Sequence, residues 1–221
     1  MSTSKTRILG RLRQQGHLQS RVIPGAAASD AQWLALQPPL GDLSQRFQRE
    51  AQAVGAEILP VPDWDALPNR IPPWLAEVGV KTVLIGDEPR LAPLRKSLQT
   101  HPGLSTQVWD KPLEDQKALV FSTDCGITTT LGGLAETGTL ILAPTPEEPR
   151  LLSLAPPIHL AVLEKSRLMG RLSEFVRQGV YQRERPTNLV LITGPSRTAD
   201  IELTLVLGVH GPRRLLVALV G

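Results

Sequence analysis

NLVLITGPSRTADIELTLVLGVH, residues 188–210, is the stretch from which we infer the fold. Its apolar, β-branched run at residues 189–193 is typical of a fully buried strand. Gly194 and Pro195 end that strand, because proline donates no backbone hydrogen bond and glycine allows a sharp change of direction. The mostly apolar residues 201–207 predict a helix. The stretch therefore predicts a strand, a tight polar turn and a helix.

The start of this predicted helix suits an anion. Its first backbone N–H groups have no partner within the helix, and the helix dipole adds positive potential. Arg197 adds a planar guanidinium that pairs well with a carboxylate or phosphate. A purely local interpretation stays open. In it Ser196 or Thr198 caps the helix, while Asp200 and Glu202 satisfy the dipole and weaken the attraction for an outside anion.

The rest of the chain alternates between short apolar strands and amphipathic helices. This alternation predicts an α/β fold, a mainly parallel sheet with helices on both faces. The strands are expected at residues 57–61, 82–85, 106–109, 119–121, 139–143, 158–163, 189–193 and 215–220, and the helices at residues 42–55, 64–78, 89–99 and 168–177.

The length of 221 residues allows one domain with a small appendage. We expect an N-terminal helix over residues 2–15 and an irregular arm up to residue 41, followed by the α/β domain at residues 42–221. The first acidic residue is Asp30, so this N-terminal region is basic. A solvated helix face explains the basic residues better than docking on an acidic partner does, although both interpretations stay open.

Composition excludes several classes of protein. The net charge of +3 is too small to indicate nucleic-acid binding, and no aromatic-interleaved basic face is visible. A single cysteine, Cys125, excludes an intrachain disulfide and any cluster held by several cysteines of this chain; we expect it to be buried and inert. We expect no membrane span, no signal peptide and a cytoplasmic location. No two of the four histidines lie four residues apart, so we expect no metal site.

Three polar, glycine-rich turns are expected at the carboxyl ends of strands, where parallel sheets bind ligands. They are residues 122–138, 144–159 and 194–202. The first contains Glu136, a candidate base, nucleophile or hydrogen-bond acceptor between glycine-containing turns. The alternative is that Glu136 pairs with an arginine and the glycines form a bulge or hairpin.

The second turn contains Arg150 and ends at His159, which leads into a strand. We take His159 as a candidate that titrates near neutral pH and acts as an acid or base. The alternative for His159, and equally for His210, is a packed histidine held by a hydrogen bond. Neither a dinucleotide-binding glycine pattern nor a Walker motif occurs, so the sequence gives no support for a nicotinamide or flavin cofactor.

Four segments together resemble the LUD-domain family, most closely its lactate utilisation protein C branch. They are Ala135-Glu136-Thr137-Gly138-Thr139-Leu140, Arg150-Leu151 with Ser153 and Pro156…His159, the run Gly194-Pro195-Ser196-Arg197-Thr198-Ala199-Asp200-Ile201-Glu202, and Gly208-Val209-His210-Gly211-Pro212. The resemblance extends over residues 42–221.

The resemblance implies the α/β fold of sugar-phosphate isomerases and coenzyme A transferases. It also implies a bacterial role in oxidising L-lactate to pyruvate, together with two cysteine-rich partner proteins that hold iron–sulfur clusters. This chain resembles the cluster-free member. We take Glu136 and His159 as the candidate catalytic residues. The candidate ligand-binding residues are Thr137, Gly138, Arg150, Ser153, Gly194, Pro195, Ser196, Arg197, Thr198, Asp200, Glu202 and His210.

Three hypotheses follow. In the first, the chain is a subunit of a lactate-oxidising complex, in which Arg197 holds a small carboxylate and Glu136 or His159 moves a proton or fixes the hydroxyl. In the second, it is a stand-alone acyl or coenzyme A transferase with Glu136 as nucleophile. In the third, it is a regulatory or scaffold protein that senses a small carboxylate and docks through its N-terminal helix.

Overall fold

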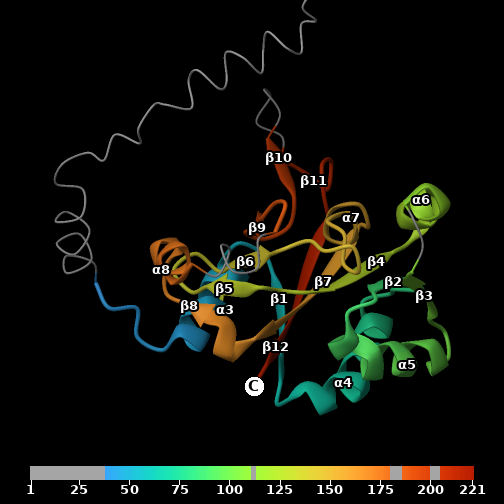
Figure 1. Cartoon of the computed structure of the whole chain (residues 1–221), viewed down its shortest axis with the longest axis horizontal. Helices are drawn as coiled ribbons and strands as arrows, with labels where there is room; N and C mark the ends of the chain where they lie inside the picture. The colour runs from blue at the N-terminus through green and yellow to red at the C-terminus, as the bar shows by residue number, and fades with distance from the viewer. Residues whose placement is uncertain (1–37, 111–112, 180–185, 200–204) are drawn as a thin grey trace, which may run out of the picture. The chain divides into compact units, whose positions relative to one another are not determined.

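Six parallel strands form the central sheet (Figure 1). The computed structural model describes residues 38–110, 113–179, 186–199 and 205–221. All neighbouring strands of the central sheet pair in parallel, which confirms the predicted α/β class. Their order across the sheet is β1 (Glu57–Val61), β12 (Arg214–Val220), β7 (Ile158–Glu164), β4 (Cys125–Thr129), β2 (Thr82–Gly86) and β3 (Ser105–Trp109).

The two faces of this sheet are covered differently. Helices α4 (Leu67–Glu77) and α5 (Ala92–Thr100) pack on the face formed by side chains such as Val83, Leu160 and Leu216. The opposite face packs against α3 (Leu43–Ala53) and a second, smaller sheet. Two more helices, α6 (Leu113–Ser122) and α7 (Leu151–Leu154), contribute to the cluster around Leu84. Helices therefore lie on both faces, as predicted.

The smaller sheet has the order β8-β5-β6-β9 and is mostly antiparallel. Its strands are β8 (Leu168–Met169), β5 (Gly132–Leu134), β6 (Thr139–Leu142) and β9 (Val190–Ile192). Leu140 and Leu142 of β6 belong to the same apolar cluster as Ala161 and Val217 of the central sheet. This packing puts β9 beside the central sheet and not within it.

The prediction for residues 188–210 is wrong in two respects. Strand β9 exists, but it lies at the edge of the smaller sheet, and Leu191 is 47% exposed. The helix expected at residues 201–207 is absent where the structure describes the chain, because β10 (Arg197–Ala199) and β11 (Leu205–Leu207) form an antiparallel hairpin. The Gly208 N–H continues this pairing by donating to the Ser196 carbonyl at 3.0 Å. Short apolar runs fit either a strand or a helix, and cross-strand pairing decides here.

Two further boundaries differ from the prediction. Residues 119–121 belong to α6 and not to a strand; the Thr123 hydroxyl donates to the Leu119 carbonyl at 2.7 Å just beyond the end of α6. The helix expected from residue 168 begins later, as α8 (Leu172–Gln178), because β8 occupies the first two positions. The predicted N-terminal helix and most of the arm lie outside the described residues.

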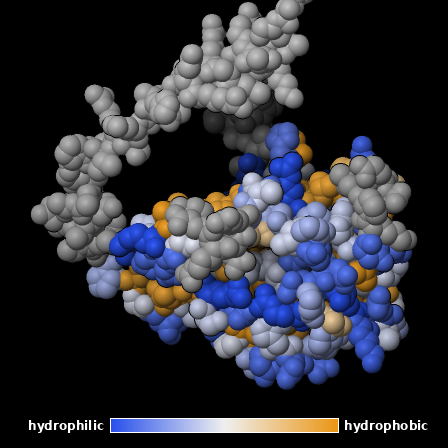
Figure 2. Space-filling model, in the orientation of Figure 1, coloured by the Kyte–Doolittle hydropathy of each residue, from blue (hydrophilic) through white to orange (hydrophobic). Residues whose placement is uncertain are grey.

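The surface in view mixes polar and apolar residues (Figure 2). The described part of the chain contains no helix with the length and apolar character needed to cross a bilayer. Helix α8 exposes about half of Leu172 and half of Val176.

Candidate functional site

Two cavities are lined in part by residues of the smaller sheet. The first, which we call the carboxyl-end cavity, has a volume of about 330 Å³, and its polar lining includes Glu88, Arg90, Thr129, Glu148, Arg150 and Arg167. The second, which we call the histidine cavity, has a volume of about 420 Å³, and its polar lining includes His159, Thr193, Ser196, Arg197 and His210. Ser153 of α7 lines both.

The carboxyl-end cavity lies where the sheet topology favours ligands. Strand β2 pairs with β3 on one side and with β4 on the other, so the direction in which the chain builds the sheet reverses at β2. Ligands of open parallel sheets bind beyond the carboxyl ends of strands near such a reversal. Glu88 and Arg90 follow β2, Thr129 ends β4, and Arg167 follows β7.

Glu148 is the buried acid of the carboxyl-end cavity, with 9% of its surface exposed. Its Oε1 accepts from the Thr129 N–H at 2.9 Å, and its Oε2 accepts from the Thr129 hydroxyl. Burial raises the pKa of this carboxyl, an effect that the two Thr129 hydrogen bonds partly oppose. The site requires glycine at position 86, since a Cβ there would lie 2.5 Å from Glu148 Cγ.

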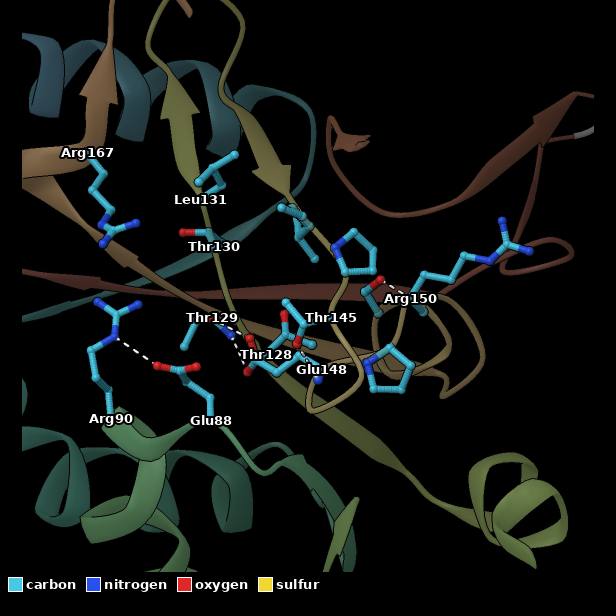
Figure 3. Close-up of a pocket in the computed structure, with 15 residues that line it drawn as sticks. Glu88, Arg90, Thr128, Thr129, Thr130, Leu131, Thr145, Glu148, Arg150 and Arg167 are labelled. Carbon is cyan, nitrogen blue, oxygen red and sulfur yellow. Dashed lines mark hydrogen bonds and ion pairs between the residues drawn. The ribbon is translucent and has the colours of Figure 1, made fainter. Parts of the chain in front are cut away.

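Two guanidinium groups, those of Arg90 and Arg167, face this cavity from the same side (Figure 3). Glu164 forms ion pairs with both of them. Arg90 Nε also pairs with Glu88 Oε1 at 3.2 Å, and its guanidinium lies 4.9 Å from the centre of the Trp64 ring. The side chain of Arg150, in contrast, extends away from Glu148 (Figure 3).

His159 is fully buried on β7, near the amino end of that strand. Its Nε2 forms a 2.9 Å hydrogen bond with the Thr128 hydroxyl, whereas its Nδ1 has no partner among the described residues. Burial lowers the pKa of His159 to about 3. The expectation that His159 titrates near neutral pH is therefore wrong, because a charged imidazole has no compensating partner in this environment.

Arg197 lines the histidine cavity from β10. Its Nη2 donates to the Val54 carbonyl at 2.7 Å, and the residue is otherwise exposed. We predicted that Arg197 would lie beside the start of a helix and help that helix bind an anion. Arg197 instead lies in a strand of the β10–β11 hairpin. Backbone amides of Ser196 and Gly208 are used in pairing, to Pro212 and Ser196. These two amides are therefore not available to an anion, whereas the guanidinium keeps donors for one.

The predicted site residues separate into three groups. The first lines the histidine cavity and comprises Ser153, His159, Gly194, Pro195, Ser196, Arg197 and His210. The second, Arg150 with Ser153 again, lines the carboxyl-end cavity. Thr198 lies in β10, and Asp200 and Glu202 lie outside the described residues.

The third group, around Glu136, lines neither cavity. The Glu136 carboxylate pairs with Arg171 Nε at 3.0 Å, the arrangement that we had kept as its alternative. Thr137 bonds to Thr139, which bonds in turn to Thr193 at the rim of the histidine cavity. A Cβ at Gly138 would lie 2.2 Å from the Ala51 backbone N, so this turn packs tightly on α3. The transferase hypothesis, which needs Glu136 as nucleophile, gains no support from this placement.

Sequence reasoning missed Glu148, Arg90 and Arg167. Glu148 lies within the expected turn 144–159, but no local pattern distinguishes it from the exposed Glu147 beside it. Arg90 and Arg167 follow β2 and β7. Because ligands of parallel sheets bind beyond the carboxyl ends of strands, this position could have identified both residues as candidates.

The remaining chemical predictions concern sulfur and metals. Cys125 is fully buried, and burial raises the pKa of its thiol, which confirms an inert cysteine. Among the described residues, no group of three or more His, Cys, Asp or Glu side chains is arranged to hold a metal ion.

Comparison with known proteins identifies the family. Residues 44–220 match the family model of the LUD domain. The chain belongs to the LUD-domain family. The LUD match covers all the described strands of both sheets and both cavities. Over 84% of this LUD chain, the fold also resembles the crystal structure of a DUF162 family protein from Deinococcus radiodurans, with a TM-score of 0.60, 24% identity and 100% of that chain covered.

Curated LUD relatives include lactate utilization protein C of Halalkalibacterium halodurans, which is 34% identical over 158 residues, 68% of this chain and 67% of that protein. Lactate utilization protein C of Bacillus subtilis is 38% identical over 59% of this chain and 58% of that protein. An uncharacterized protein of Neisseria meningitidis is 34% identical over 63% of this chain and 60% of that protein. The chain thus spans about 60% of the length of several curated relatives that it matches.

Proposed function

We propose that this LUD protein is a cytoplasmic component of a bacterial L-lactate utilisation system. In this proposal it acts in the oxidation of L-lactate to pyruvate, together with partner proteins that hold iron–sulfur clusters. The names of the relatives called lactate utilization protein C support the pathway. The iron–sulfur partners are what the family resemblance implies, and the proposal assigns the clusters to them because this chain has a single, buried cysteine.

The proposed ligand of the histidine cavity is a small 2-hydroxy or 2-oxo carboxylate. One observation carries this proposal: a neutral, buried imidazole and an exposed guanidinium line the same cavity. Arg197 keeps N–H groups beyond the one given to Val54, and these bind a carboxylate.

The hydroxyl or keto oxygen of the ligand would bind on the His159 side. A neutral imidazole has one donor and one acceptor nitrogen, so Nδ1, which is buried and has no partner among the described residues, would take the role opposite to that of Nε2 once a ligand oxygen reaches it. The Ser153 hydroxyl donates to the Arg150 carbonyl at 2.8 Å and keeps acceptor capacity for a ligand hydroxyl. His159 thus fixes an oxygen as a neutral hydrogen-bonding group.

The pathway is tested by reconstitution. The chain is co-purified from its host with its partners, and lactate oxidation is measured with each protein omitted in turn. We expect oxidation to require this chain and the iron–sulfur partners together. Lactate oxidation by this chain alone with an ordinary electron acceptor, or undiminished oxidation without it, would contradict the proposal.

The ligand site is tested separately by calorimetric titration with L-lactate and pyruvate. Arg197→Gln should weaken binding of both about tenfold, because it removes the charge-assisted pair. Arg70→Gln is the matched control, since Arg70 is an exposed residue of α4, on the opposite face of the central sheet. Equal affinities in the two variants would assign the carboxylate to another place.

A further inference from the structure

The carboxyl-end cavity contains charged groups that the proposed lactate chemistry does not use. Arg90, Arg167 and Glu148 line this cavity and are absent from the lining of the histidine cavity. The two cavities share Ser153, and the Thr128 hydroxyl, from a residue lining the first, bonds to His159 of the second. These are neighbouring sites with different chemistry.

The guanidiniums of Arg90 and Arg167 keep hydrogen-bonding capacity. Arg90 uses Nε toward Glu88 and Nη1 toward Glu164, and Arg167 uses Nε toward Glu164 at 3.5 Å. A guanidinium has five N–H donors, so each retains several on its terminal nitrogens. Both groups pair with the Glu164 carboxylate, so they lie near one another beside the cavity, where one oxyanion could contact both.

Glu148 offers a different contact. Each of its carboxyl oxygens accepts one hydrogen bond from Thr129 and keeps a second lone-pair direction. The Glu148 N–H donates to the Thr145 hydroxyl at 3.0 Å, and Gly86 packs directly against Cγ, so the carboxyl group is fixed in place. Burial raises the pKa of Glu148, so its charged form is less favoured than that of an exposed carboxylate.

We propose that the carboxyl-end cavity is a second binding site, for a small organic molecule that carries a phosphate or carboxylate group. Arg90 and Arg167 hold the anionic group, and Glu148 hydrogen-bonds to a neighbouring hydroxyl or carbonyl of the ligand. Leu131, Leu142 and Pro144 form the apolar part of the lining, which suits a short carbon skeleton. A volume of about 330 Å³ is at the small end of ligand pockets, so the molecule is a small metabolite.

Trp64 provides a direct reporter for the test, because Arg90 lies over its ring. Purified full-length protein is titrated with inorganic phosphate and, in parallel, with succinate, and both tryptophan fluorescence and heat are recorded. We expect saturable binding of one or both anions. The anion that binds identifies the class: phosphate indicates a phosphate ester, and succinate indicates an organic acid. The fluorescence change should be absent in Trp64→Phe while the heat remains.

The decisive variant is Arg167→Gln, because the Arg167 side chain is 40% exposed and its loss leaves the core intact. It should raise the Kd of the bound anion at least tenfold, and Arg90→Gln should do the same by calorimetry. Arg70→Gln and Arg197→Gln, the second from the histidine cavity, should leave that Kd unchanged. No saturable binding of either anion, an unchanged Kd in Arg167→Gln, or an equal loss in Arg197→Gln would overturn the second site.

Discussion

The two cavities differ in how the fold creates them. The carboxyl-end cavity forms where β2, β4 and β7 end, and its charged side chains come from the turns that follow these strands. The histidine cavity lies against the side of the central sheet, near the amino ends of β7 and β12, and β9 and the 193–197 segment close it. Strand topology sets the position of the first, with the end of β6 completing its lining, whereas the second exists only because a smaller sheet packs on the larger one.

The difference extends to their polar groups. The polar core of the histidine cavity is a neutral imidazole with one ring nitrogen unpaired among the described residues. The carboxyl-end cavity combines a buried carboxyl group with guanidiniums that already have carboxylate partners. The first therefore combines one guanidinium with a neutral hydrogen-bonding group, and the second combines two guanidiniums with a buried carboxyl group.

The largest expected effect comes from Gly126→Ala, which would disrupt both cavities at once. A Cβ at Gly126 would lie 1.9 Å from the Leu152 carbonyl oxygen, so α7, with Ser153, must move. We expect the free energy of unfolding to fall by about 3 kcal/mol or more, as for severe overpacking of a core. Urea denaturation followed by circular dichroism measures this.

Gly103→Ala is the control for this variant. Nothing lies within 4 Å of a Cβ at Gly103, and its φ of +89° makes alanine there cost only about 1 kcal/mol of backbone strain. If the free energy of unfolding fell by similar amounts in the two variants, α7 would be able to move at little cost, and glycine at position 126 would not be needed to form the cavities.

The next prediction concerns how the free energy of unfolding depends on pH through the buried titratable group of each cavity, beginning with His159. In the unfolded chain His159 has a pKa near 6.5, whereas burial in the folded chain lowers the pKa of His159 to about 3. The unfolded state therefore binds more protons in this window, and stability falls as the pH drops from 6.5 toward 3. His159→Gln should lack this contribution, so wild type should lose roughly 2 kcal/mol more than the variant between about pH 7 and about pH 4.5 in urea denaturation. Parallel pH profiles of the two proteins would show that the imidazole is solvated in the folded state.

Glu148 should respond with the opposite sign. Burial raises its folded pKa above the ordinary value of 4.5, so its contribution to stability is present at low pH and declines as the pH rises through that folded pKa. Glu148→Gln should accordingly make stability depend less on rising pH, which the same denaturation series measures. A steeper loss with rising pH in the variant than in wild type would mean that this carboxyl is stabilised in its charged form.

The smallest effect is expected at Glu136, outside both cavities. Its side chain is 44% exposed and its pair with Arg171 is partly screened by water, so Glu136→Gln should lower the free energy of unfolding by at most about 1 kcal/mol. Thermal unfolding at low and high salt measures this loss, which salt should reduce. A loss of several kcal/mol would show that the ion pair is not screened, and a tenfold loss of lactate affinity would place this turn at the histidine cavity.

The predictable part of the fold rests on buried strands. Residues such as 158–163 and 215–220 are almost continuously apolar, and only a sheet covered on both faces buries such runs. The prediction was wrong where a short apolar run has two possible partners. Residues 205–207 pair with β10 instead of forming a helix, and residues 119–121 continue α6 instead of forming a strand. Local preference does not decide between these states, since the energy comes from pairing with distant residues.

The sequence by itself determined the α/β class, the parallel pairing of buried strands and an inert cysteine, because these depend on apolar content and on residue type. It also identified Ser153, His159 and residues 194–197 as candidate site residues, and all of these line the histidine cavity. Only the tertiary structure decided that Glu136 turns toward Arg171, that His159 is neutral, and that Glu148 meets Arg90 and Arg167 at one cavity. Each of those outcomes depends on burial and on contacts between residues far apart in the chain, which no local pattern encodes.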